Sequence, residues 1–354
     1  MTFFRLQRRH GRARSRALSV SIHWTWPLGF ALVFLLTSCT TGGGNAPSLL
    51  DPRGPAASRV AGLIWLVFAI AGVICLLVLL ALLWALFRRH GQRENAGRPF
   101  NENRVIVIFG VAIPALVLFV VYGFSLATTA YLASPPSNPR LTVNVVAHQW
   151  WWEVQYPEQQ FATANEIHIP VGQSIQVKVT SDDVIHDFWV PQLNDKIDMF
   201  PGRTNTTWLQ ASQPGTYRGV CAEYCGAEHA LMNFVVVAEP PAQFETWLTA
   251  QSQPALQPAA QGGDILRGYQ TFIGSSCSYC HAVKGTDAAG RYGPDLTHFA
   301  GRETIAAGTL PNTRGNLAGW ITNTQGIKPG NRMPAFPLDA RSLQDLLAYL
   351  QSLT

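Results

Sequence analysis

Two long uncharged stretches limit what this chain can fold into more than any other feature of its sequence. Residues 60–87 and 105–132 each run for 28 residues without a charged side chain. A helix of that length spans about 42 Å, which exceeds the hydrocarbon core of a bilayer, about 30 Å thick. We therefore predict two transmembrane helices within residues 59–132. Pro114 in the second helix is tolerated because neighbouring groups can bond the carbonyl that it frees.

The segment between the predicted spans indicates their orientation. Residues 88–104 carry five arginines against two glutamates. Short loops rich in Lys and Arg stay in the cytoplasm. Both outer flanks are then expected on the outer side of a bacterial inner membrane, so everything after residue 132 is predicted to lie in the periplasm or its equivalent.

The N-terminal region, residues 1–38, has the composition of an export signal. Six arginines within the first 16 residues precede an apolar run, residues 24–36, that is too short to cross a bilayer. The run ends in Leu-Thr-Ser-Cys, which resembles a lipobox, so we predict cleavage before Cys39 and lipidation of that residue. A leader without lipidation is the alternative. A connector, residues 39–58, follows.

The formal net charge of +5 belongs to this leader. Removing its six arginines leaves 20 basic against 21 acidic side chains in the rest of the chain. That balance gives no indication of nucleic-acid binding. A charged fraction of only 13% beside 47% hydrophobic residues is typical of a membrane protein.

The segment from Gly219 to Met232 collects side chains that bind metals. Two thiols, an imidazole and a thioether lie within it, a second imidazole lies 35 residues before the first thiol, and these candidates are Cys221, Cys225, His229, Met232 and His186. Sulfur ligands combined with imidazole nitrogen suit copper. A single thiolate with two imidazoles and a weak Met would form a mononuclear site. The second thiolate, four residues later, lets both sulfurs bridge two copper ions.

Two other interpretations of this segment stay open. Zinc accepts two thiolates and two imidazoles, but its structural cysteines usually form tight knuckles, and zinc would leave Met232 without a role. A disulfide between Cys221 and Cys225 is the simplest alternative in an oxidising compartment. The combination of ligand types favours copper over both.

The region around this segment, residues 140–239, alternates apolar and polar residues in short runs. Four of these runs predict strands, namely residues 141–147, 166–170, 174–180 and 234–238. Several short strands separated by Pro and Gly turns predict an all-β sandwich or barrel. Such a scaffold suits copper electron transfer because strands hold the ligands still while the charge of the metal changes.

Two further features of this region concern the candidate site. Asp183 precedes His186 by three residues and is a candidate to orient its imidazole, with a solvated turn acid as the alternative. Three consecutive tryptophans begin at Trp150. On a strand, alternation would place Trp150 and Trp152 on one face and Trp151 on the other. Packing in a core or an interface is the ordinary role of such a run.

Three motifs resemble the binuclear copper (CuA) domain of cytochrome c oxidase subunit II. They are S-D-D-V-I-H-D-F-W-V-P around His186, P-G-R from Pro201, and C-A-E-Y-C-G-A-E-H-A-L-M from Cys221. The resemblance implies a cupredoxin-like Greek-key domain whose copper ligands are the five side chains named above and the backbone carbonyl of Glu223. It also implies that the Glu223 carboxylate reaches a magnesium ion shared with subunit I, and that electrons enter at Trp150.

The sequence departs from the resemblance in the second span. Many subunits II place a glutamate near the cytoplasmic start of this span, at the mouth of a proton channel. That position is Val107 here, and the nearest acid is Glu102. The carboxylate that the family uses at this point is therefore missing.

The last part of the chain carries the attachment signature of a c-type haem. Residues 240–261 contain a stretch rich in Gln, Pro and Ala that predicts a linker, and residues 262–354 are predicted to form a separate small domain. Cys277, Cys280 and His281 form the pattern C-x-x-C-H. In this pattern the two thiols add covalently to the haem vinyl groups and the histidine is the proximal iron ligand.

Met333 is the candidate distal ligand of that haem. It follows His281 by about fifty residues, and His/Met ligation raises the potential of a c-type haem. A bis-His haem through His298 is the alternative. The order of these residues resembles a class I cytochrome c, which implies a helix over residues 343–350 and a hydrogen bond from the proximal histidine to the carbonyl of Pro294.

The sequence as a whole predicts a multidomain membrane protein with a two-helix transmembrane hairpin, an all-β cupredoxin-like domain and a small all-α cytochrome c domain. It resembles cytochrome c oxidase subunit II with a fused cytochrome c domain, from oxidases with haems a, a₃ and c. The resemblance implies that cytochrome c reduces the covalent haem, that the haem reduces the binuclear copper, and that the copper reduces haem a of subunit I. Oxygen reduction and proton pumping would occur in that partner.

Three alternatives to this interpretation exist. A nitric oxide reductase subunit would use the same copper domain and haem. A quinol oxidase subunit would keep the spans and strands but lack Cys221, Cys225 and His229, so these residues argue against it. A lipid-anchored binding or assembly module that stores metal would not be reduced rapidly by cytochrome c.

Overall fold

The computed structural model describes residues 47–88, 101–134 and 139–354. The predicted signal peptide, Cys39 and most of the arginine-rich segment between the spans lie outside these residues. Cleavage, lipidation and the orientation of the spans therefore stay predictions.

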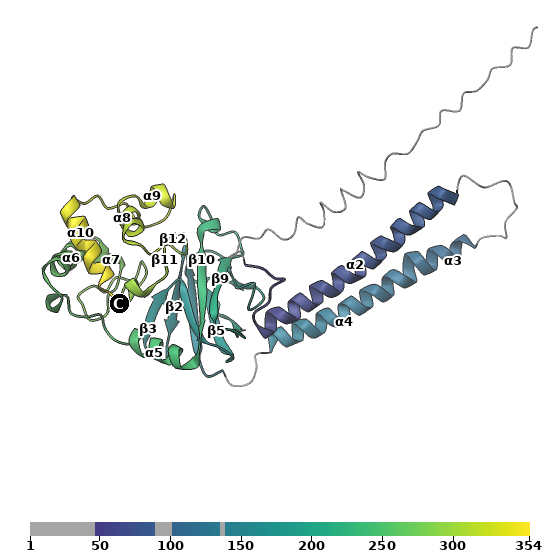
Figure 1. The fold of residues 1–354 in the computed structure, drawn as a ribbon, viewed down its shortest axis with the longest axis horizontal. Helices are drawn as coiled ribbons and strands as arrows, with labels where there is room; N and C mark the ends of the chain where they lie inside the picture. Colours follow the sequence, from purple (N-terminus) through teal and green to yellow (C-terminus); the bar gives the residue numbers. More distant parts are fainter. Residues whose placement is uncertain (1–46, 89–100, 135–138) are drawn as a thin grey trace, which may run out of the picture. The chain divides into compact units, whose positions relative to one another are not determined.

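Two long helical segments form where the uncharged stretches lie (Figure 1). The first is α2 (Pro55–Arg88), and the second comprises α3 (Glu102–Val107), the π-helix η1 (Ile108–Ala112) and α4 (Ile113–Ala133). Both are long and apolar enough to cross a bilayer. Pro114 lies in the first turn of α4, directly after the π-helix. The wider hydrogen bonding of a π-helix accommodates the missing N–H of the proline without ending the segment.

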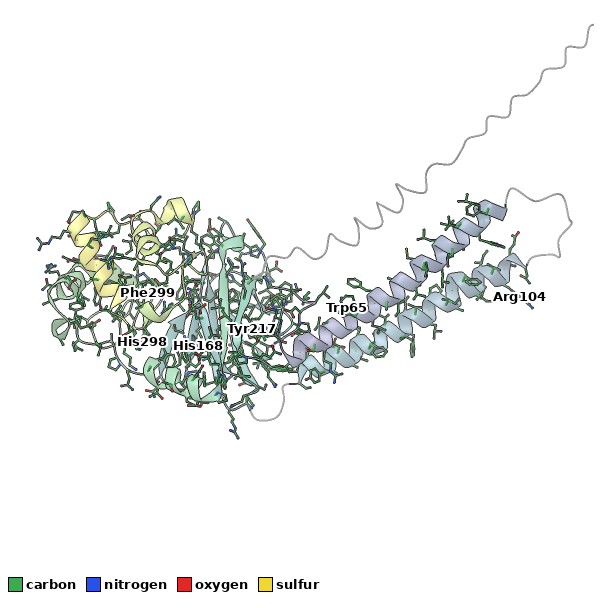
Figure 2. All side chains as sticks on the ribbon, viewed as in Figure 1. Trp65, Arg104, His168, Tyr217, His298 and Phe299 are labelled. Carbon is green, nitrogen blue, oxygen red and sulfur yellow. The ribbon has the colours of Figure 1, made fainter. Side chains whose placement is uncertain are left out.

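The side chains of these helices are exposed, as a bilayer requires. Trp65 on α2 is 56% exposed and Phe119 on α4 is 76% exposed (Figure 2 labels Trp65). At the end of α4, the carbonyl of Leu132 accepts a hydrogen bond from the indole of Trp208 at 3.0 Å. The ring of Tyr131 packs edge-on against the same indole, with 5.9 Å between centroids. The second helix is thereby tied to the domain that follows.

That domain is a sandwich of two five-stranded sheets. Its strands are β1 (Thr142–His148), β2 (Trp151–Tyr156), β3 (Phe161–Ala164), β4 (Glu166–Pro170), β5 (Ile175–Ser181), β6 (His186–Trp189), β7 (Ile197–Met199), β8 (Asn205–Leu209), β9 (Gly215–Cys221) and β10 (Asn233–Glu239). The sheets have the orders β3-β2-β1-β5-β8 and β4-β10-β9-β6-β7. Strands β1 and β5 pair in parallel, as do β10 and β4. The predicted cupredoxin-like domain is confirmed, and all four predicted strands are present.

Aromatic rings fill the sandwich behind the candidate copper ligands. The ring of Trp152 lies 4.8 Å from that of Phe234 between centroids, and Phe188 stacks on Phe234 at 4.7 Å. Gly219 on β9 makes room for this stack, because a Cβ atom there would lie 2.2 Å from the ring of Phe234. The ring of His186 is 6.3 Å from that of Trp152. A close-packed core of this kind leaves the strands beneath the site little freedom to move.

The tryptophan run differs from the alternation predicted for a single strand. Gln149 and Trp150 form the turn between β1 and β2, and β2 begins only at Trp151. Trp152 is fully buried, whereas Trp150 is partly exposed. The prediction that Trp150 and Trp152 share one face of a strand is therefore wrong. The turn contains no Gly, Pro, Asn or Asp, so it carries none of the usual turn signals.

The C-terminal part of the chain is mainly helical. Its elements, with the helix and turn that precede them, are α5 (Pro241–Gln251), η3 (Pro258–Ala260), α6 (Gly263–Gly274), α7 (Cys277–Cys280), η4 (Phe299–Gly301), β11 (Thr304–Ile305), β12 (Leu310–Pro311), α8 (Arg314–Thr322), α9 (Thr324–Ile327) and α10 (Ala340–Gln351). The domain was predicted to be all-α, and the short β11–β12 pair is its only two-stranded sheet among the residues that the structure describes. The helix predicted over residues 343–350 lies within α10.

Helices α6 and α10 pack closely against each other in this domain. A Cβ atom on Gly268 of α6 would lie 2.0 Å from the carbonyl oxygen of Asp345 on α10, so only glycine permits this contact. The guanidinium of Arg267 binds both carboxylate oxygens of Asp345 at 2.7 and 2.8 Å. Figure 2 labels Phe299 and His298, which belong to the same domain.

Candidate metal centres

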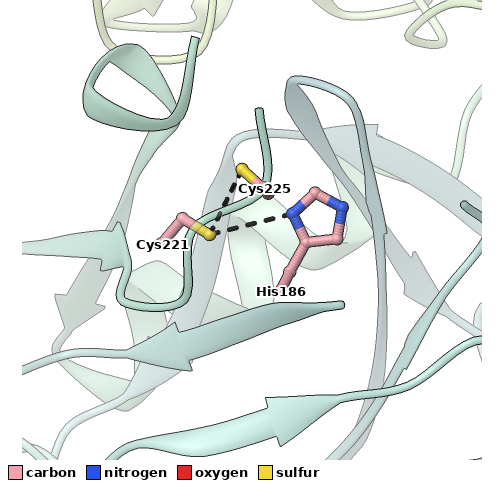
Figure 3. A group of neighbouring side chains, drawn as sticks. All are labelled: His186, Cys221 and Cys225. Carbon is pink, nitrogen blue, oxygen red and sulfur yellow. Dashed lines mark hydrogen bonds between the residues drawn. The ribbon is translucent and has the colours of Figure 1, made fainter. Parts of the chain in front are cut away.

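The thiols of Cys221 and Cys225 lie at the centre of the candidate copper site, and the other three candidate side chains surround them. His186 begins β6 and Cys221 ends β9, and these strands are neighbours in one sheet. The Sγ atoms of Cys221 and Cys225 are 3.7 Å apart, and Nδ1 of His186 is 3.7 Å from Sγ of Cys221 (Figure 3). On the other side, Sγ of Cys225 lies 3.7 Å from Nδ1 of His229 and 3.8 Å from Sδ of Met232.

Glu223 adds a sixth atom to this group. Its backbone carbonyl oxygen accepts a hydrogen bond from the Cys221 thiol at 3.2 Å, so it lies beside the candidate ligands, as a carbonyl proposed to bind copper must. Its side chain is exposed. The structure thus brings together every residue that the sequence proposed as a copper ligand.

Hydrogen bonds prepare the donors for metal binding. Oδ1 of Asp183 lies 2.9 Å from Nε2 of His186, as predicted, which leaves Nδ1 facing the sulfur. Although burial opposes it, this contact and two backbone N–H groups lower the pKa of Asp183 to about 2. The thiol of Cys225 and the ring of His186 lower the pKa of Cys221 to about 3. The same contact between the two thiols raises the pKa of Cys225. A thiolate is the form that binds metals.

The chemistry of this donor set fits copper. Both cysteines are free thiols, so they form no disulfide. The thioether of Met232 is fully buried and contacts Cys225, a position that a zinc site of thiolates and imidazoles would not use. His186, Cys221 and Cys225 offer ligand atoms that all lie within 4.8 Å of one another. Bound copper would supply one-electron redox chemistry.

The turn at Trp150 contacts this site directly. The indole Nε1 of Trp150 donates to the carbonyl of Cys225 at 3.1 Å, and Nε2 of Gln149 donates to the same oxygen at 2.8 Å. A Cβ atom on Gly226, whose φ is +117°, would lie 3.0 Å from the Trp150 ring. The sequence singled out Trp150 but gave no signal for Gln149, because an isolated amide before a tryptophan has no recognisable pattern.

A cavity of about 450 Å³ lies beside Cys277, Cys280 and His281. Its apolar lining includes Phe272, Leu317, Ile321, Phe336, Leu346 and Leu350. A volume of several hundred Å³ with apolar walls is typical of a cofactor site. Nε of Arg302, which also lines the cavity, is buried and has no hydrogen-bond partner among the described residues. Such a donor suits the carboxylates of a haem, so the residues present fit that group.

His281, the candidate proximal ligand, is held in one orientation by a backbone carbonyl. Nδ1 of His281 lies 2.8 Å from the carbonyl oxygen of Pro294, the hydrogen bond predicted from the sequence. This bond fixes the tautomer and leaves Nε2 available as a ligand. A Cβ atom on Gly293 would lie 2.7 Å from the imidazole, so glycine is needed for this packing. Burial lowers the pKa of His281, which keeps the imidazole neutral.

The two distal candidates differ in where they lie. Met333 lines the same cavity as Cys277, Cys280 and His281. His298 is not among the residues that line it; Nδ1 lies 2.7 Å from the carbonyl of Thr354 and Nε2 lies 3.0 Å from that of Gln253. With both ring nitrogens bonded elsewhere, His298 is poorly placed to serve as an iron ligand.

The copper domain contributes to the wall of the same cavity. His148, Gln149, Trp150 and Trp151 line it together with Met333. Several contacts that the sequence did not predict join the two domains here. They include Arg332 Nη2 to Gln149 Oε1 at 3.0 Å, Glu303 N to Glu166 Oε1 at 2.8 Å, Asn233 N to Ala307 O at 3.0 Å, and Lys328 Nζ to Trp150 O at 2.9 Å.

Three family models match successive parts of this chain. Residues 48–128 match the model described as cytochrome c oxidase subunit II, transmembrane domain, and residues 159–239 match that of its periplasmic domain. Residues 265–354 match the model described as cytochrome c. The order of the matches is the order of domains predicted from the sequence.

Curated relatives extend the similarity over nearly the whole chain. Cytochrome c oxidase subunit 2 of Alkalihalophilus pseudofirmus is 35% identical over 336 residues, which cover 92% of this chain and 96% of the relative. The protein of the same name from Bacillus subtilis is 30% identical, covering 88% of this chain and 92% of the relative. Among solved structures, the periplasmic domain of subunit II of cytochrome oxidase from Bradyrhizobium japonicum is 33% identical with a TM-score of 0.32, covering 33% of this chain and 96% of that one.

The family models and the full-length relatives agree with the fold described above. The chain is a membrane protein, and it belongs to the family of cytochrome c oxidase subunit II, in a form that carries a fused cytochrome c domain.

Proposed function

We propose that this subunit accepts electrons from cytochrome c on a covalent haem c and passes them through a binuclear copper centre to haem a of subunit I. Oxygen reduction and proton pumping would take place in that partner. The observation that carries the proposal is the position of Trp150. Its side chain lines the cavity of the haem domain, while its indole Nε1 bonds the carbonyl of Cys225 at 3.1 Å. One residue therefore contacts both candidate centres.

The copper centre would be held by six groups of the copper domain. They are the side chains of His186, Cys221, Cys225, His229 and Met232 and the backbone carbonyl of Glu223. The buried sulfurs and the packed sheets behind them would keep the site nearly unchanged when an electron arrives, which lowers the reorganisation that slows electron transfer. Asp183 would hold the His186 ring in its binding tautomer.

The haem would be held by four residues of the C-terminal domain. Cys277 and Cys280 would form the covalent links, and His281 and Met333 would be the axial ligands. Arg302 would bind a haem carboxylate with its unpartnered Nε. His/Met ligation gives the higher potential that an acceptor for cytochrome c needs.

Further parts of the proposal concern the surroundings of these centres. We place both on the periplasmic or outer side of the membrane, as the arginine-rich loop indicates. The domain boundaries predicted above, export by a lipoprotein-type signal with lipidation at Cys39, and a magnesium ion bound by the exposed carboxylate of Glu223 at the boundary with subunit I belong to the same proposal.

The metal and haem content of the purified chain, with its optical spectrum, tests this function. We expect two coppers and one covalent haem per chain, with a near-infrared mixed-valence band. Addition of reduced cytochrome c should reduce the haem first and then bleach the near-infrared band. Zinc or a single copper, or a near-infrared band that does not respond to the donor, would contradict the proposal.

A further inference from the structure

A buried lysine of the haem domain contacts the copper domain at the proposed electron-transfer site. Lys328 follows α9 and is 2% exposed. Its Nζ atom donates to the carbonyls of Trp150 and Leu231 in the copper domain, at 2.9 Å each, and to that of Ala306 in its own domain at 3.3 Å. An ammonium has three N–H donors, and all three are used.

The carbonyls that Lys328 binds are close to the copper ligands. Trp150 donates its indole N–H to the carbonyl of Cys225, and Leu231 directly precedes Met232. The side chain of Lys328 also lines the cavity proposed for the haem. One ammonium therefore connects the wall of one centre to the backbone beside the other.

The charge of Lys328 is compensated inside the protein. Burial lowers the pKa of its ammonium to about 8, and the charge of Glu228 opposes this effect. Glu228 is 6% exposed, and its Oε2 atom has no hydrogen-bond partner among the described residues. A buried charge adds little net stability compared with an apolar side chain of the same size, but it restricts the arrangement of the groups around it.

Lys328 also binds a strained loop. Ala306, Ala307 and Gly308 have φ values of +54°, +57° and +76°, and two consecutive non-glycine residues in this region are uncommon. Such a conformation persists only where the surroundings fix it. Lys328 binds the carbonyl of Ala306, and the carbonyl of Ala307 accepts a bond from the N–H of Asn233 in the copper domain at 3.0 Å.

We propose that Lys328 is a positioning residue that fixes the haem domain against Trp150 and Leu231 of the copper domain for electron transfer between the two centres. The inference rests on the proposed function. Arg332 contacts the same region, but its side chain is 64% exposed and its contacts are open to solvent. Lys328 is buried and binds both domains through one atom. Because electron transfer slows steeply with distance, a small displacement of the haem domain would slow the internal step.

The test compares Lys328→Met with the native chain, both carrying haem and copper. Met fills a similar volume without a donor. A pulse of a ruthenium photoreductant reduces the haem, and the recovery of haem absorbance with bleaching of the near-infrared band gives the internal transfer rate. We expect that rate to fall roughly tenfold or more and to become dependent on solvent viscosity, because redocking of the domain then limits it. Redox titration of the haem accompanies the measurement, because loss of a buried positive charge from the cavity wall lowers the haem potential. A lower haem potential alone would speed transfer to the copper, so slower transfer still reports displacement of the domain.

Hydrogen exchange supplies a readout that does not depend on electron transfer. The N–H groups of Asn233 and Glu303 bond across the two domains, so their exchange should accelerate in Lys328→Met. The N–H of Val236, inside the β9–β10 pairing, should not change. Lys178→Met, at an exposed position of β5, is the matched control and should behave like the native chain in every measurement.

The outcomes separate the inference from the function on which it rests. A native chain without two coppers and a haem contradicts the proposed function. A native chain with both, whose Lys328→Met variant keeps its internal rate and its exchange at Asn233 and Glu303, overturns the inference alone. If Lys328→Met does not mature, Lys328→Gln is measured in the same way; we expect slower transfer and faster exchange there too, and no change in that variant overturns the inference.

Discussion

The two candidate centres are built in different ways. The candidate copper ligands are sulfur, nitrogen and oxygen atoms whose neighbouring pairs lie 3.2 to 3.8 Å apart, at the edge of a packed β-sandwich. The candidate haem site is a cavity of about 450 Å³ lined mainly by residues of the helical domain, and Trp150 and its neighbours in the copper domain form part of its wall. The copper domain packs without a metal, whereas the haem domain has a buried apolar cluster beside a cavity that a cofactor would fill.

The double variant Cys277→Ala/Cys280→Ala tests whether the haem domain depends on its cofactor, and it has the largest expected effect. Without the cofactor, water would contact the apolar walls of a cavity of about 450 Å³, and truncating even one large core side chain costs roughly 2 to 5 kcal/mol, a large part of the stability of a small domain. We expect the haem domain to be unfolded and the copper domain to remain folded, as measured by limited proteolysis.

The control for that experiment lies between the two thiols. Ser278→Ala removes only a hydroxyl that donates to the carbonyl of Ile273 at 3.2 Å, so the haem domain should stay folded. A double variant whose haem domain resists proteolysis as the native one does would show that its core does not depend on the cofactor.

On the copper side, Cys221→Ser should remove the metal centre and leave the fold. The near-infrared band and electron delivery to haem a should be lost, while the haem c spectrum stays, because the core behind Cys221 is packed independently of the metal. Optical spectra measure the near-infrared band and the haem c, and oxygen consumption with cytochrome c measures electron delivery. Cys75→Ser, at an exposed position of α2, is the matched control and should keep copper. Intact electron delivery in Cys221→Ser would contradict the assignment of the copper ligands.

Met333→Leu changes the candidate distal ligand and leaves the cavity filled to a similar extent. The covalent haem should remain, and its potential should fall by roughly 0.1 V or more, because a thioether ligand raises the potential of a c-type haem. Redox titration of the haem measures this. His298→Gln should leave the potential unchanged, since both nitrogens of that ring bond backbone carbonyls. The opposite pattern would make His298 the distal ligand.

The smallest effect is expected from pH, and it concerns the packing of the copper domain. Burial alone would lower the pKa of His168, but hydrogen bonds with Glu166 and Glu239 outweigh it and raise the pKa. A raised pKa stabilises the folded state fully below the unfolded value of about 6.5, and this stability is lost as pH rises through the folded value. The slope cannot exceed about 1.4 kcal/mol per pH unit for one proton.

Chemical denaturation followed by tryptophan fluorescence measures this dependence. Trp247 on α5 stacks on His168 with 3.9 Å between ring centroids, so it reports on the same contact (Figure 2 labels His168). The free energy of unfolding of the copper domain should decline above pH 6.5 in the native chain, and the decline should be smaller in His168→Gln. Equal slopes in both chains would exclude His168 as its source.

Local patterns in the sequence were enough to predict the fold class, the order of the domains and the candidate ligands. Uncharged runs, strand alternation and C-x-x-C-H are patterns of residues close together in the sequence. They can therefore be recognised without knowing how the chain folds. The cluster around Cys221 and Cys225 was readable because soft donors four residues apart have few other uses.

The contacts between the two candidate centres could be found only from the tertiary structure. It placed Trp150 in a turn instead of a strand, turned His298 away from the cavity, and brought Lys328 to Trp150 across 178 residues of sequence. These contacts join irregular loops whose residues show no periodicity. Their positions depend on how the packed cores orient the loops, and this information is distributed over both domains, so no local stretch of sequence contains it.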